Sequence, residues 1–78
     1  MSNASAQEFT VRNYLVRIYA DQMLMPDGDG WVGAWIIYRL PRSPWDDPIR
    51  FGDTELVASQ AIAVSMAKDI ASIVAAAL

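Results

Sequence analysis

Three features of the sequence predict an α+β fold in which an antiparallel sheet packs on one long C-terminal helix. Residues 9–25 and 31–40 are rich in β-branched and aromatic residues, as β-strands are. The residues between them, 26–30, are turn formers. From 54 to 77 the apolar residues instead follow the spacing of an amphipathic helix. We therefore expect a two-layer domain over residues 9–78.

The two long strands are expected to form a β-hairpin. Placing Met25 opposite Trp31 gives a register in which Val16, Ile18 and Ala20 face the helix. In that register the second strand completes the core face with Ile36, Tyr38 and Leu40.

A proline-rich segment separates the hairpin from the rest of the fold. Residues 41–48 contain three prolines and are expected to be a loop. Residues 49–51 follow as a short third strand, and Asp53 or Thr54 is expected to cap the helix. The expected order is therefore β-β-β-α, with these helix residues in the core: Leu56, Ala63, Ala67 and Ile70.

Length and composition indicate self-association. A chain of 78 residues has a thin core, and 54% of these residues are apolar. With no Cys and no His, neither a disulfide nor an ordinary zinc site can stabilise it, and we expect no metal and no cofactor. Oligomerisation, most simply to a homodimer, is the remaining device, and we expect it through the sheet face with Trp31 and Trp35, through the helix, or through both.

The sheet face away from the helix is the expected partner-binding surface. Tyr, Trp, Met and Arg are enriched where proteins meet a partner. In the expected register this face carries the candidate partner-binding residues Arg17, Tyr19, Trp31, Trp35, Ile37 and Arg39. The alternative is that loop 41–48 folds back and covers part of the face with Trp45.

Two arginines on that face raise a second functional hypothesis. Arg17 and Arg39 are expected nearly opposite each other, and like charges across a ladder need a counter-charge. Asp21 or a carboxylate of a second subunit could supply it, or both arginines could simply be solvated. A nucleic-acid phosphate is a further alternative, with the aromatic residues stacking on bases. The net charge of −3 argues against that alternative, a small RNA- or single-stranded-DNA-binding module.

The sequence gives little support for the hypotheses of an enzyme or a calcium-binding protein. Asp27 and Asp29 alternate like calcium ligands, but the chain runs directly into an apolar strand, so hairpin turn chemistry is favoured. Asp46 and Asp47 are adjacent carboxylates without a recognisable nucleophile and base. We expect no catalytic residue and a non-enzymatic protein.

The chain ends carry further expectations. Residues 1–8 are mostly small and polar, so we expect a disordered tail, and they lack the features of a signal peptide, so we expect a cytoplasmic protein. The apolar tract 56–78 is long, but Lys68 and Asp69 near its middle argue against a membrane span.

The order of short motifs resembles the N-terminal domain of HicB-type antitoxins. The matching pieces are residues 14–18 (Tyr-Leu-Val-Arg-Ile), 29–31 (Asp-Gly-Trp), 40–41 (Leu-Pro) and 52–54 (Gly-Asp-Thr), the last leading to Ala58. The chain departs from the family in its longer hairpin loop, its proline-rich insert and its end at the helix, where such antitoxins usually append a DNA-binding module. The resemblance implies a role in neutralising a protein toxin.

Overall fold

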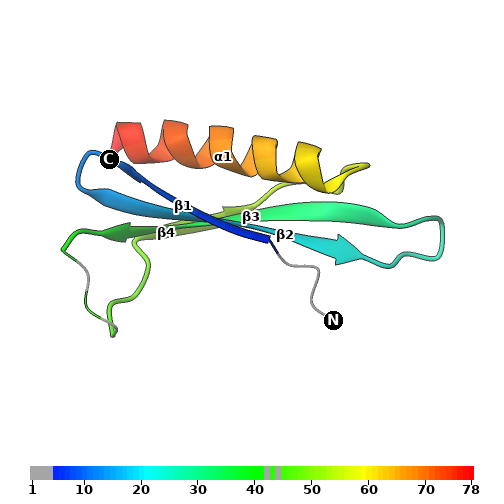
Figure 1. Cartoon of the computed structure of the whole chain (residues 1–78), viewed down its shortest axis with the longest axis horizontal. Helices are drawn as coiled ribbons and strands as arrows, with labels where there is room; N and C mark the ends of the chain where they lie inside the picture. Colours follow the sequence, from blue (N-terminus) through cyan, green and yellow to red (C-terminus); the bar gives the residue numbers. More distant parts are fainter. Residues whose placement is uncertain (1–4, 42, 44) are drawn as a thin grey trace.

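The computed structural model describes residues 5–41, 43 and 45–78 and shows an antiparallel sheet with one C-terminal helix. The elements are β1 (Ser5–Val11), β2 (Tyr14–Met23), β3 (Gly30–Arg39), β4 (Arg50–Asp53) and α1 (Gln60–Ala77). The strands follow the order β1-β2-β3-β4, and α1 lies along one face of the sheet (Figure 1). The expected α+β class and C-terminal helix are confirmed, with one strand more than expected.

The additional strand comes from the N-terminal segment. The single strand expected from residue 9 is divided by a two-residue turn, in which Arg12 has a φ of 55° and Val11 pairs with Tyr14. β1 begins at Ser5, so residues 5–8 belong to the sheet instead of the expected tail. Residues 1–4 lie outside the described part. Phe9 and Val11 pack against the core, which explains why this segment joins the sheet.

The register of the β2–β3 hairpin differs from the expected one by three residues. Met23 lies opposite Gly30, Ile18 opposite Trp35 and Val16 opposite Ile37. Because side chains alternate along a strand, an odd shift turns every β3 side chain to the other face. The β2 half of the core is confirmed, since Val16, Ile18 and Ala20 are fully buried.

The β3 half of the expected core faces the other side of the sheet for the same reason, although Tyr38 is buried as expected. Trp35 and Ile37 face the helix and are buried. Ile36 and Tyr38 lie on the opposite face, where Ile36 is half-buried and Tyr38 is buried. Leu40 falls just beyond β3.

The helix packs on the sheet through a stripe of small residues. Ala63, Ala67, Ala71 and Ala75 are fully buried, one per turn, which confirms Ala63 and Ala67 as core residues. Alanine has the smallest side chain available to a helix besides glycine, so α1 lies close to β2 and β3. Of the other expected helix residues, Ile70 is half-buried against the core, and Leu56 is exposed.

The helix begins six residues later than expected, at Gln60. The residues before it stay extended along β3: Val57 exchanges two backbone hydrogen bonds of 2.8 Å with Trp31. The cap is Ser59, whose Oγ accepts a hydrogen bond from the backbone N–H of Ile62 at 3.2 Å. Thr54 is buried and hydrogen-bonded to β3, so neither it nor Asp53 can cap α1.

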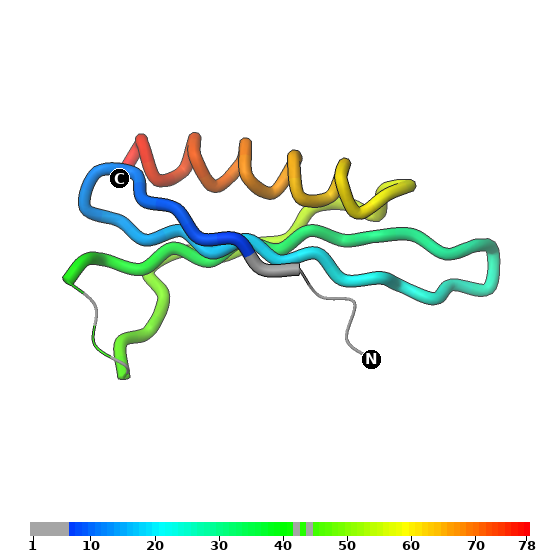
Figure 2. Tube along the Cα trace, viewed as in Figure 1, coloured from blue at the N-terminus to red at the C-terminus, as the bar shows by residue number. Residues whose placement is uncertain are grey.

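The trace in Figure 2 shows the β2–β3 hairpin extending past the N-terminal end of α1. The helix itself is long and apolar enough to cross a membrane, with a mean hydropathy of 1.3. The core helix of a soluble domain has the same properties, and the buried alanine stripe places α1 against the sheet.

Candidate functional site

The side of the sheet away from α1 forms a largely apolar surface, here named the open face. The pairing of the strands places alternate side chains on it. Its described members with side chains are Glu8, Thr10, Leu15, Arg17, Tyr19, Asp21, Met23, Val32, Ala34, Ile36, Tyr38, Phe51 and Asp53.

One row of side chains crosses the open face from edge to edge. Ile36 lies at its centre, with Arg17 opposite on β2 and Phe51 opposite on β4. Phe51 is 72% exposed although it is a large aromatic residue. Leu15 is half-buried in the neighbouring row, and Val32 is half-buried two rows away, opposite Asp21. The centre of the face is therefore apolar and accessible.

Arg17 is held in this row by its neighbours. Its Nε lies 2.8 Å from Oε2 of Glu8, the residue directly opposite on β1. Its guanidinium carbon lies 5.6 Å from the centroid of the Tyr19 ring. Arg17 therefore has a counter-charge within the chain, supplied by Glu8.

The six candidate partner-binding residues are split between two sides of the sheet. Arg17 and Tyr19 lie on the open face. Trp35 and Ile37 are buried under the helix and cannot contact a partner.

Trp31 and Arg39 belong to the helix side of β3. Trp31 is half-buried, and Arg39 is exposed opposite Tyr14. The expected facing of Arg17 and Arg39 is therefore wrong, because Arg17 lies opposite Ile36.

Sequence reasoning missed the β3 and β4 members of the open face. Val32, Ala34 and Ile36 alternate with Trp31, Trp35 and Ile37, so both faces of β3 are apolar. The alternation alone could not select the buried set. The one available signal was Gly33, since a close approach of a helix favours glycine.

The proline-rich loop does not lay its tryptophan on the open face. Trp45 is 85% exposed. Asp46 instead holds the loop: its carboxylate accepts hydrogen bonds from the Ser43 backbone N–H at 2.8 Å and from Ser43 Oγ at 3.2 Å. A hollow of about 320 Å³ beside this loop is lined by Arg39, Leu40, Pro41, Asp46, Asp47 and Ile49.

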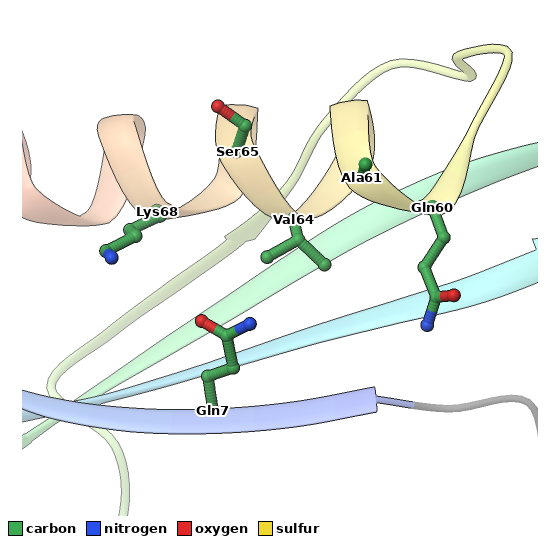
Figure 3. A pocket seen from close by; sticks show the side chains of 6 residues that line it. All are labelled: Gln7, Gln60, Ala61, Val64, Ser65 and Lys68. Carbon is green, nitrogen blue, oxygen red and sulfur yellow. The ribbon is translucent and has the colours of Figure 1, made fainter.

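A second feature is a groove of about 530 Å³ between β1 and α1 (Figure 3). Gln7 projects from β1 toward the helix, and Gln60 projects from α1 toward the sheet. The remaining lining residues are Ala61, Val64, Ser65 and Lys68. The Lys68 ammonium also lies 5.6 Å from the centroid of the Phe9 ring. None of these described lining residues is acidic.

In the described part of the chain, no group of three or more His, Cys, Asp or Glu residues could hold a metal ion. No protein-family model, curated protein or solved structure matches this chain. Evidence for the function therefore comes from the surfaces of the fold.

Proposed function

We propose that this chain is a small non-enzymatic protein-interaction module that forms a homodimer through the open face of its sheet. The observation that carries the proposal is the exposure of Phe51 beside Ile36. Contiguous apolar surfaces of this kind commonly mark contacts between proteins.

The charges on the open face favour a protein partner over a nucleic acid. Glu8, Asp21 and Asp53 are carboxylates, and Arg17 is the one cation among the described residues of this face. Arg17 is already paired with Glu8. Phosphates would be repelled, because nucleic-acid affinity comes mainly from uncompensated Lys and Arg.

A second copy of the chain matches the area of the open face and would cover the thin core. β2 and β3 have ten residues each. Strands of that length are about 33 Å long, and four strands span about 15–20 Å, so two stacked faces would bury on the order of 1,000 Å². That area is near the lower limit for a specific interface, and it would thicken a core whose helix contributes mainly alanines.

The HicB-type resemblance supports the same class of function. A protein that neutralises a toxin also acts by covering another protein, and the open face is an apolar surface suited to this. The homodimer is the part of the proposal that can be tested with the chain alone.

The test is the molar mass measured by light scattering during size-exclusion chromatography, over a range of concentrations. We expect at least twice the 8.6 kDa monomer mass for the unmodified chain, at low and high salt alike. Phe51→Asp is expected to halve the molar mass of the unmodified chain, with a rise in the Kd of the open-face contact of at least about tenfold.

The matched control is Ile73→Asp. Ile73 is 71% exposed, almost the same as Phe51, but lies on α1 on the other side of the molecule. It should leave the mass unchanged. Equal effects of both variants, or a concentration-independent monomer for the unmodified chain, would refute the open-face dimer.

Nucleic-acid binding is tested separately by fluorescence anisotropy with a labelled single-stranded DNA and a labelled RNA. We expect no saturable binding at 150 mM salt. Saturable binding that weakens steeply with salt and is lost in Arg17→Ala would favour the nucleic-acid alternative.

A further inference from the structure

We propose that β1 pairs edge to edge with β1 of a second copy in antiparallel orientation, which joins two sheets into one of eight strands. This interface is separate from the open face. The sheet edge, the groove beside it and the charges along β1 support this pairing.

The two edges of the sheet are protected very differently. β4 has four residues, two of them charged, and it follows Pro48. β1 has seven residues and contains no Pro, no Gly and no Lys. Its one charged residue, Glu8, is turned to the open face and paired with Arg17. Natural proteins keep free edges short, charged or interrupted by proline, and β1 has none of these features.

The helix leaves room for an added strand. α1 lies over β2 and β3, and the groove of about 530 Å³ opens beside β1. An added strand would send alternate side chains toward this groove. The amides of Gln7 and Gln60 can both donate and accept hydrogen bonds there (Figure 3).

Symmetry and charge restrict the register, and we place Gln7 on the axis because its amide can donate to and accept from its own copy. A two-fold axis perpendicular to the sheet keeps each helix on the same side, so a residue of β1 must lie on the axis and face its own copy. Placing Glu8 on the axis would bring two carboxylates together, which is unfavourable. Placing Gln7 on the axis pairs Gln7 with Gln7 and sets Glu8 opposite Ala6 of the second copy.

The two interfaces together would generate a tetramer. Two isologous contacts with perpendicular axes give D2 symmetry, in which two eight-stranded sheets stack through their open faces. Loss of one contact leaves a dimer held by the other, so the two proposals fail separately.

The test uses the absence of cysteine from the chain. In Gln7→Cys, the two Cα atoms across the axis would lie about 4.5–5.5 Å apart, within disulfide range. In the control Thr10→Cys, they would be about 20 Å apart along the strand. Under mild oxidation we expect Gln7→Cys to give at least ten times more covalent dimer than Thr10→Cys.

The same comparison in a Phe51→Asp background separates the two interfaces. Edge pairing predicts that Gln7→Cys still crosslinks there, and that Gln7→Lys, which would bring two ammonium groups together, halves the molar mass of the Phe51→Asp protein. Equal crosslinking of Gln7→Cys and Thr10→Cys, or of neither, overturns the proposal. Preferential crosslinking through Glu8→Cys overturns the register.

Discussion

Gly33 lies directly against the first turn of α1. A Cβ atom at this position would lie 2.3 Å from the carbonyl oxygen of Ala63 and 3.0 Å from the Cβ of Ala67. The nearest of these atoms belongs to the helix backbone, so no side-chain rotation can make room. This contact sets how closely the helix approaches the sheet.

Gly33→Ala is therefore expected to destabilise the domain by about 1–3 kcal/mol, because α1 must move away from β3. The sign is informative, since Gly→Ala at an unstrained site usually stabilises by about 0.4–1 kcal/mol through the unfolded chain. Urea unfolding followed by circular dichroism measures the difference. A variant as stable as the parent would contradict the close contact.

Thr54 forms two hydrogen bonds with Gly33. The backbone N–H of Gly33 donates to Thr54 Oγ1 at 2.9 Å, and the Thr54 N–H donates to the Gly33 carbonyl at 2.8 Å. Thr54→Val leaves the buried Gly33 N–H without its acceptor, which should cost about 1–3 kcal/mol. Thr54→Ser keeps the hydroxyl and should cost less than half as much. If both variants lose the same stability, the methyl group and not the hydrogen bond is responsible.

Ser59 and Asp53 give a direct comparison of helix caps. Ser59 Oγ accepts the Ile62 N–H, so Ser59→Ala should lower the free energy of unfolding by about 1 kcal/mol. Asp53 ends β4, six residues before the cap, so Asp53→Ala should change it by less than about 0.5 kcal/mol. The opposite order in a denaturation series would mean that α1 begins near Thr54.

The fold class was predictable because the signals were redundant. The alternation in β2, the turn residues after it and the helical spacing near the C-terminus each indicate an element independently. Val16, Ile18, Ala63 and Ala67 were placed correctly, because each lies on the apolar face that the spacing of residues in its strand or helix predicts. The early helix start failed because local capping signals at Asp53 and Thr54 cannot report the backbone bonds between Trp31 and Val57.

The candidate site was less predictable because it depends on the hairpin register. β3 is apolar on both faces, and the expected loop of five residues is a loop of six in the structure. β2 ends two residues earlier and β3 begins one residue earlier than expected, which gives the three-residue shift of pairing and places Trp35 and Ile37 in the core instead of on the surface. Ile36 took their place on the open face.

The opposite roles of Trp35 and Phe51 provide the last prediction. Trp35 is 8% exposed and packs over Gly52, where an added Cβ would lie 2.6 Å from its ring. Trp35→Asp removes a large buried side chain and buries a charge, so we expect a loss of at least about 4 kcal/mol and an unfolded chain at 25 °C. Because Phe51 is largely exposed, Phe51→Asp should leave the stability of the folded monomer nearly unchanged. Its urea midpoint should be close to that of the unmodified chain at concentrations where that chain is monomeric.

Trp35→Phe is the conservative control for the core position. The Trp35 Nε1 is buried and has no hydrogen-bond partner in the described part of the chain. Replacement by Phe therefore reduces the buried volume without breaking a hydrogen bond. It should lose less than about 2 kcal/mol and remain folded by circular dichroism. A Trp35→Asp protein that is well folded but monomeric would instead support the register expected from the sequence, in which Trp35 faces a partner and Ile36 faces the helix.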